Sequence, residues 1–311
     1  MITTGSLFSG YDGLGLGLDM LIPNTRQWFV EINTHASKVL NSAWPTVPNL
    51  SDIITTNWNT VPPVDVLTGG FPCQDLSIMG RRQGIAPQTR SGLWTCMADA
   101  INVLRPRMVL IENVQGILSA KAIGGTLEQC EQCVDETRNT TLRALGAVVG
   151  NLTQMGYSSR WGTVAAAEAG ALHPRKRVFI IAHPRDQPLH QWWFTAGGRT
   201  ISGRLRPDSR SIPTPMTSDH SGGGMTDSVV RREEFLETYG HNLQYWAKVT
   251  NQEPPPPVDS GRINHVFVEW LMGVPLGHVT GVASWAQSMK MLGNGAVPQQ
   301  VALAISRLLP A

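Results

Sequence analysis

The chain has 311 residues, of which 41% are hydrophobic and 15% are charged. This length predicts one large domain with a smaller second one, and this composition excludes a chain that is disordered over most of its length. The formal net charge of +2 excludes a globally basic protein, so any nucleic-acid surface would have to be a local patch.

We find no targeting or membrane signal in the sequence. Residues 1–20 contain no Lys or Arg, and the longest uncharged run near the C-terminus, 270–289, is interrupted by three Gly and one Pro. Four cysteines are too few for a disulfide framework. We therefore expect a cytoplasmic protein with no membrane span.

Short apolar segments alternate with helical patterns over the first two-thirds of the chain. We expect strands over 2–8, 28–30, 64–68, 108–111, 158–165 and 178–182, and helices over 34–43, 93–104, 265–271 and 298–309. Strands joined by helices predict an α/β fold with a mostly parallel sheet that is covered on both faces.

The pattern changes after His183, where Trp, Gly and Pro replace the alternation. Four prolines at 254–257 predict a stiff linker. We therefore expect a main domain over 1–183 and 263–311, and a small irregular domain over 184–262. From 175 to 210 there are eight Lys or Arg against two Asp, with tryptophans interleaved, which suits a nucleic-acid face.

The first two predicted strands end in residues that suit a nucleoside. A glycine-containing turn at 8–14 would let a ligand approach the backbone, and Glu31 could accept hydrogen bonds from both ribose hydroxyls. Asp52 and Ile53 follow. These features predict a cofactor that carries a nucleoside, and they leave open a dinucleotide or S-adenosylmethionine.

Cys73 follows the third strand, within a turn that also contains Gly70, Pro72 and Gln74. The carboxyl end of a central parallel strand lies at the ligand-binding edge of the sheet. A thiolate at that edge would be a nucleophile if its pKa is lowered.

Two further groups are expected at the same edge. Glu112 follows the strand over 108–111, and a carboxyl with a raised pKa could donate a proton to a ring nitrogen. Arg175 and Arg177 precede the strand over 178–182. Side chains at i and i+2 of extended backbone point the same way, so both arginines could bind a carbonyl oxygen or a phosphate.

The order of these motifs resembles the DNA (cytosine-5) methyltransferase family, over roughly 1–182 and 263–309. The matching segments are Phe8-Ser9-Gly10-Tyr11-Asp12-Gly13, Pro72-Cys73-Gln74, Glu112-Asn113-Val114, Arg175-Lys176-Arg177 and Gly293-Asn294-Gly295-Ala296-Val297-Pro298. The resemblance implies a Rossmann-like S-adenosylmethionine-dependent methyltransferase sheet with a small target-recognition domain, here 184–262.

The resemblance also implies a role for each candidate. Cys73 would attack C6 of a cytosine flipped out of double-stranded DNA, Glu112 would hold and protonate N3, and Arg177, with Arg175 beside it, would bind O2. The residues implied to bind S-adenosylmethionine are Phe8, Gly10, Glu31, Asp52, Ile53, Gly70, Pro72, Leu93 and Asn294.

The sequence departs from the family pattern at several positions. Asp12 stands where glycine is usual, His173 replaces a glutamine, and Gly295 and Ala296 replace a serine and a valine. A polar stretch over 119–141 is an addition and contains Cys130 and Cys133. One CxxC pair without a second pair is weak evidence for zinc, so we expect no metal.

Three other functions are considered beside DNA methylation. A cytosine-5 RNA methyltransferase acting on tRNA could use the same active site, but the separate 184–262 region favours DNA. A dehydrogenase that binds NAD is disfavoured because Gly13, Gly15 and Gly17 lack the GxGxxG spacing. Intact Cys73 and Glu112 argue against an inactive DNA-binding protein. We expect a monomer, and whether it has a cognate restriction endonuclease stays open.

Overall fold

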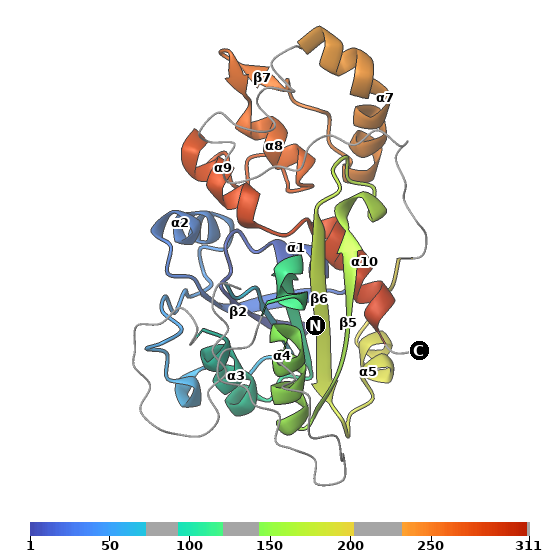
Figure 1. Cartoon of the computed structure of the whole chain (residues 1–311). Coiled ribbons are helices and arrows are strands. Elements are labelled where there is room, and N and C mark those ends of the chain that lie inside the picture. The colour runs from blue at the N-terminus through green and yellow to red at the C-terminus, as the bar shows by residue number, and fades with distance from the viewer. Residues whose placement is uncertain (73–92, 121–142, 202–231, 310–311) are drawn as a thin grey trace.

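The computed structural model describes residues 1–72, 93–120, 143–201 and 232–309 (Figure 1). These residues contain a six-stranded sheet with the order β2-β1-β3-β4-β6-β5. The strands are β1 (Ile2–Leu7), β2 (Asn24–Val30), β3 (Val66–Gly69), β4 (Met108–Val114), β5 (Tyr157–Ala165) and β6 (Lys176–Pro184). The predicted α/β class and Rossmann-like sheet are confirmed.

One strand of the sheet is reversed. The strands β2, β1, β3 and β4 run parallel, whereas β6 runs antiparallel to both of its neighbours, β4 and β5. The beginning of β6 therefore lies beside the end of β4, and Arg177 pairs with Val114. This reversal brings Arg177 to the edge of the sheet at which the parallel strands end.

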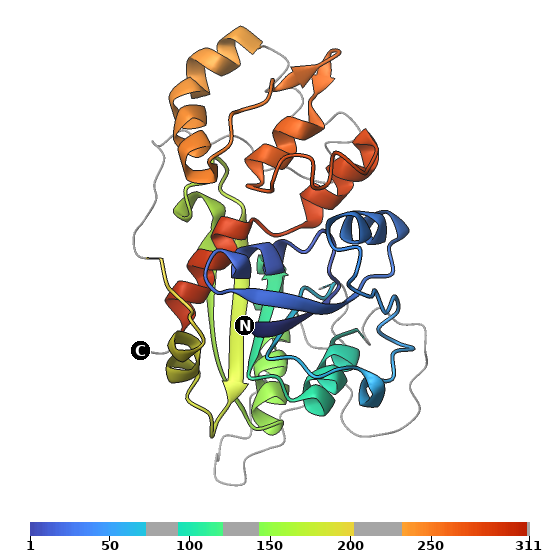
Figure 2. The ribbon, with the colours of Figure 1, turned by 180° about the vertical axis from the view of Figure 1, so that it is seen from behind.

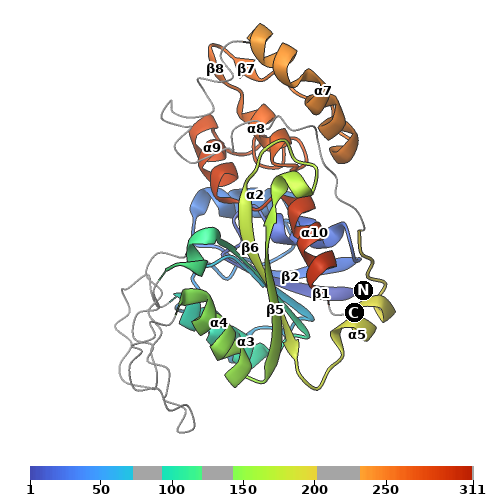
Figure 3. The ribbon, with the colours of Figure 1, turned by 45° about the vertical axis from the view of Figure 1, so that its right-hand side comes forward.

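Helices cover both faces of the sheet, as predicted (Figure 3). On one face lie α3 (Leu93–Leu104) and α4 (Ala144–Gln154), whose apolar residues form one core with Ile111 of β4. On the other lie α1 (Gly13–Asp19), α5 (Leu189–Thr195) and α10 (Pro298–Leu308), which pack against Leu110. Such two-sided burial explains why the strands are apolar at consecutive positions.

The remaining elements gather beyond the carboxyl edge of the sheet, in the upper part of Figures 1 and 2. They are α7 (Arg232–Thr250), β7 (Val258–Asp259), β8 (Arg262–Ile263), α8 (His265–Leu271) and α9 (Trp285–Asn294). Trp246 and Trp270 are buried together, and Trp246 Nε1 donates a hydrogen bond to the Trp270 carbonyl at 2.9 Å. No helix in the described part of the chain has the length and apolar character to cross a bilayer.

The division of the chain differs from the expected bounds of 184–262. Trp193 is buried in the core that α10 forms on the sheet, and Arg199 Nε donates to the Met20 carbonyl at 2.9 Å, so 184–201 pack with the sheet. Residues 232–250 form the helix α7 instead of irregular structure. The helices α8 and α9 pack with each other and with α7, away from the sheet. Of the Lys and Arg residues counted over 175–210 as a nucleic-acid face, Arg204, Arg206 and Arg210 lie outside the described residues.

His173 joins the two groups of elements. It is fully buried just before β6, and its Nε2 lies 3.2 Å from the Leu271 carbonyl at the end of α8. Burial, reinforced by nearby Arg175, lowers the pKa of His173 to about 3. The imidazole is therefore neutral in the fold. Its Nε2–H donates a hydrogen bond to the Leu271 carbonyl, much as a glutamine amide could.

This burial predicts a loss of stability in acid. Below the ordinary histidine pKa of about 6.5 the unfolded chain binds a proton that the fold excludes, so the free energy of unfolding should fall with pH. The contribution of His173 reaches about 2 kcal/mol at pH 5. Urea unfolding of the wild type and of His173→Gln at pH 7 and pH 5 measures it. If the free energy of unfolding of His173→Gln depended on pH as that of the wild type does, the assignment of this acid sensitivity to His173 would be wrong.

Candidate functional site

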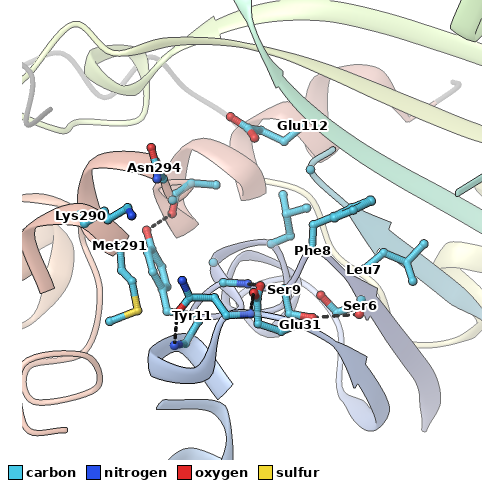
Figure 4. A pocket seen from close by; sticks show the side chains of 18 of the residues that line it. Ser6, Leu7, Phe8, Ser9, Tyr11, Glu31, Glu112, Lys290, Met291 and Asn294 are labelled. Carbon is cyan, nitrogen blue, oxygen red and sulfur yellow. Dashed lines mark hydrogen bonds between the residues drawn. The ribbon is translucent and has the colours of Figure 1, made fainter. Parts of the chain in front are cut away.

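A cavity of about 240 Å³ opens at the carboxyl edge of the sheet, between the turn that follows β1 and the helix α9 (Figure 4). It is lined by Ser6, Leu7, Phe8, Ser9, Gly10, Tyr11, Gly13, Leu14, Glu31, Asn33, Ala36, Gly70, Glu112, Gln287, Lys290, Met291, Asn294, Gly295 and Ala296. Six of the predicted site residues are in this set: Phe8, Gly10, Glu31, Gly70, Glu112 and Asn294.

The turn after β1 leaves room for a ligand against the backbone. Gly10 has a φ of 57°, and a Cβ built there would meet no atom within 4 Å. The Gly10 amide donates to Glu31 Oε2 at 2.8 Å, and the Asn33 amide donates to Oε1 at 2.7 Å. The Glu31 carboxylate is therefore held in place at the cavity wall. An open glycine turn beside a fixed carboxylate fits the ribose of a nucleoside cofactor.

Asp12 is accommodated by a buried ion pair. It adopts the left-handed conformation, with φ 62°, at the start of α1. Arg26 Nε lies 2.9 Å from Asp12 Oδ2, and the same guanidinium also contacts Asp19 and lies 4.9 Å from the centre of the Trp44 ring. Asp tolerates this backbone region better than most residues, because its side chain can bond locally. The turn therefore forms without the glycine that the family has here.

Tyr11 connects this turn to the end of α9. Its buried hydroxyl donates to the Ala296 carbonyl at 2.7 Å. A Cβ at Gly295 would lie 2.0 Å from the Tyr11 ring, so the ring occupies the space that a side chain at 295 would need. This explains why the chain has glycine where the resemblance leads one to expect serine.

Glu112 and Arg177 face each other on β4 and β6, beside the cavity. Arg177 Nε lies 2.8 Å from Glu112 Oε1 as an ion pair, although at an angle that leaves both atoms without a well-aligned hydrogen bond. Burial raises the pKa of Glu112, while Arg177 and then Arg175 oppose that effect. A Cβ at Gly70 would lie 3.3 Å from Glu112 Oε2, so the backbone after β3 passes close to the carboxyl.

Asn113 holds the segment that leads to Cys73. Its buried side chain donates from Nδ2 to the Phe71 carbonyl at 3.0 Å. Cys73 itself lies outside the described residues, two positions after Phe71. The structure thus places the approach to Cys73 against Glu112, as expected for residues at one edge of the sheet.

Arg175 differs from the expectation that it lies beside Arg177 and binds the same group. Its Nη2 donates to the carbonyls of Gly293 and Gly295, at 3.0 and 2.7 Å. The side chain is buried, and burial together with Arg177 lowers its pKa to about 10. The expectation assumed that Arg175 and Arg177 both lie in one strand, where side chains two positions apart point the same way. Arg175 precedes β6, so this rule does not apply to it. It fixes the backbone after α9.

The remaining cofactor candidates are Asp52, Ile53, Pro72 and Leu93. Ile53 is buried in the core against which Phe8 and Leu93 pack. Burial, then Asp99 and then Asp52, raise the pKa of the Cys96 thiol of α3, so Asp52 lies near that helix. Pro72 is exposed. None of these four lines the cavity formed by the described residues. Their contacts with a cofactor stay predictions.

Sequence reasoning missed the contribution of α9. Gln287, Lys290 and Met291 line the cavity from this helix, which was not among the expected elements. Its buried residues, at 288, 289, 292 and 293, follow a helical period that could have indicated it. Tyr11 was also missed, because its bond to the Ala296 carbonyl is a tertiary contact. Asn33 was missed as well, although its contacts are local and its position as the N-cap of the helix after Glu31 could have indicated it.

The sheet and this cavity define a class, the Rossmann-like methyltransferase fold, and comparison with known proteins agrees. The chain is similar to Type II methyltransferase M.BsuFI of Bacillus subtilis, with 26% identity over 76% of this chain and 50% of the relative. It is similar to Type II methyltransferase M.CviJI of Paramecium bursaria Chlorella virus IL3A, with 29% identity over 59% and 43%. The chain thus spans about half the length of these relatives or less.

Solved structures share the fold. Spodoptera frugiperda DNMT2 matches with a TM-score of 0.60 and 14% identity, covering 97% of this chain and 98% of that one. S. pombe Dnmt2 methyltransferase matches with a TM-score of 0.59 and 17% identity, covering 99% and 98%. Residues 2–216 match the family described as C-5 cytosine-specific DNA methylase. The chain belongs to that family.

The different surroundings of the two arginines predict different losses on substitution by lysine. Arg175→Lys should lower the free energy of unfolding by about 1.5–3 kcal/mol, because a lysine cannot hold two buried carbonyls in the same fork. Arg177→Lys should leave stability nearly unchanged. Denaturant unfolding of both variants measures this, and equal losses would contradict the separation of roles.

Proposed function

We propose that the protein transfers a methyl group from S-adenosylmethionine to C5 of a cytosine in double-stranded DNA. The observation that carries this proposal is the Glu112–Arg177 pair at the cavity rim, with the backbone of Gly70, three residues before Cys73, against the carboxyl. A nucleophile, a proton donor and a cation would then meet at one point of the sheet edge.

Cys73 attacks C6 of the cytosine, which breaks the aromatic system and makes C5 electron-rich. Glu112 donates its proton to N3, so that the ring accepts the electron pair. Arg177 holds the O2 carbonyl through its guanidinium. C5 then takes the methyl group, and S-adenosylhomocysteine is left. C5 loses its proton to a base, the electron pair of that C–H bond expels the Cys73 thiolate from C6, and N3 returns its proton to Glu112 as the aromatic ring is restored.

The cavity fits the cofactor by its shape and its polar groups. The Glu31 carboxylate, fixed by two backbone amides, accepts hydrogen bonds from the ribose hydroxyls. The open turn at Gly10 receives the methionine portion. When bound, S-adenosylmethionine supplies the methyl group as an electrophile. Phe8, with Asp52, Ile53 and Leu93 behind it, holds the adenine.

The base is flipped out of the duplex, because C5 and C6 are not accessible inside the stack. Sequence recognition falls to the part of 184–262 that does not pack on the sheet, since 184–201 do. Double-stranded DNA is favoured over RNA by the similarity to Type II methyltransferases. A monomeric state and action in the cytoplasm belong to the same proposal, which leaves open whether a cognate restriction endonuclease accompanies the protein.

Replacement of the acid tests the mechanism. Glu112→Gln keeps the size and a hydrogen bond but cannot deliver a proton, so methyl transfer should slow by about 10²–10⁴-fold. Because burial raises the pKa of Glu112, the wild-type rate should fall as pH rises through that pKa. The glutamine variant should lack this alkaline fall. Unchanged affinity for S-adenosylhomocysteine is the control, and a loss of affinity with normal chemistry would contradict the role.

The substrate class is tested by transfer of labelled methyl groups to duplex DNA and to tRNA. We expect label in DNA, and DNA containing 5-fluorocytosine should trap a covalent complex that Cys73→Ser cannot form. Label in tRNA alone would establish the RNA alternative. Failure to trap any complex, with normal methylation of ordinary DNA, would exclude the attack by Cys73.

A further inference from the structure

The helix α9 presents a polar stripe to the cavity. Gln287, Lys290 and Asn294 lie three and four positions apart, so they share one side of the helix, and all three line the cavity. The opposite side, with Met289 and Leu292, is buried in the core beyond the sheet. Lys290 and Asn294 are exposed and Gln287 is half-buried, so the polar ends of these side chains are accessible to a ligand that enters the cavity.

Lys290 is the only cation among the described residues that line the cavity, where the acids are Glu31 and Glu112. Figure 4 shows its side chain directed from α9 toward the turn after β1, on the side away from Phe8. No ion pair joins Lys290 to another residue of the described ranges. Its charge is therefore available to a ligand anion.

The charges of the cofactor limit how it can lie in this cavity. S-adenosylmethionine carries one anionic group, the α-carboxylate of its methionine portion. That carboxylate is repelled by Glu31, where the ribose is held, and by ionised Glu112. Attraction to the Lys290 ammonium group would draw the α-carboxylate toward α9.

We propose that Lys290 binds the α-carboxylate of the methionine portion, with the amides of Gln287 and Asn294 on either side of it. This inference rests on the proposed function only for the identity of the cofactor. Lys290 is then a cofactor-binding residue that favours S-adenosylmethionine over analogues without the carboxylate. It lies in a part of the chain that the family match over 2–216 does not include.

Binding to the DNA-free protein tests the contact without any turnover. Isothermal titration compares S-adenosylmethionine with decarboxylated S-adenosylmethionine, which keeps the sulfonium and the ammonium groups. Lys290→Gln should weaken S-adenosylmethionine about tenfold, the lower end for a hydrogen bond to a charged group because the lysine is exposed. It should leave the decarboxylated analogue within about twofold, and Lys290→Arg should restore most of the loss.

Lys38→Gln is the matched control, since Lys38 is an exposed lysine of α2 (Thr34–Ala43) that does not line the cavity. Its substitution removes the same charge and should change neither affinity. Equal weakening of both ligands by Lys290→Gln, or no weakening of either, would overturn the carboxylate contact. Loss of DNA affinity alone would show instead that Lys290 binds a phosphate. If the wild type binds neither ligand, the proposed function fails as well.

Discussion

The antiparallel direction of β6 determines which side chains meet at the active edge of the sheet. Because β6 starts where β4 ends, Arg177 of β6 lies beside Glu112 of β4, although the two residues are 65 positions apart in the chain. A buried carboxylate is unfavourable without a partner, yet a strong partner would keep it ionised. Here burial raises the pKa of Glu112 and the guanidinium lowers it, so the two effects oppose each other. This balance suits the proposed mechanism, in which the Glu112 carboxyl holds a proton and also releases it.

Three of the departures from the family pattern are matched by a partner in the fold. Asp12 is paired with Arg26, Gly295 makes space for the Tyr11 ring, and His173 donates to the Leu271 carbonyl. A buried pair such as Asp12–Arg26 adds little net stability, but removal of one partner would leave an uncompensated charge. These substitutions are therefore best understood in pairs. None of them alters Glu112 or Arg177.

Much of the sheet could be predicted from the sequence, because buried strands and their covering helices have simple periods. The helices Thr34–Ala43, Leu93–Leu104 and His265–Leu271 have the expected bounds. The strand β4 extends past the expected 111 to Val114, so Glu112 lies within a strand instead of after it. The position of Arg175, the helix α9 and the attachment of 184–201 to the sheet could not be predicted, because tertiary contacts with residues distant in sequence decide them.

The cavity depends on both ends of the chain. Tyr11 bonds the Ala296 carbonyl, and His278 Nε2 donates to the Tyr11 carbonyl at 2.8 Å. The loop that carries His278 is in turn held by the buried carboxylate of Glu269, which accepts hydrogen bonds from the amides of residues 277, 279 and 280. The turn after β1, which the proposed function assigns to the cofactor, is therefore held by residues outside the family match over 2–216. It follows that the shape of this cavity depends on the C-terminal elements as well as on the motifs near the N-terminus.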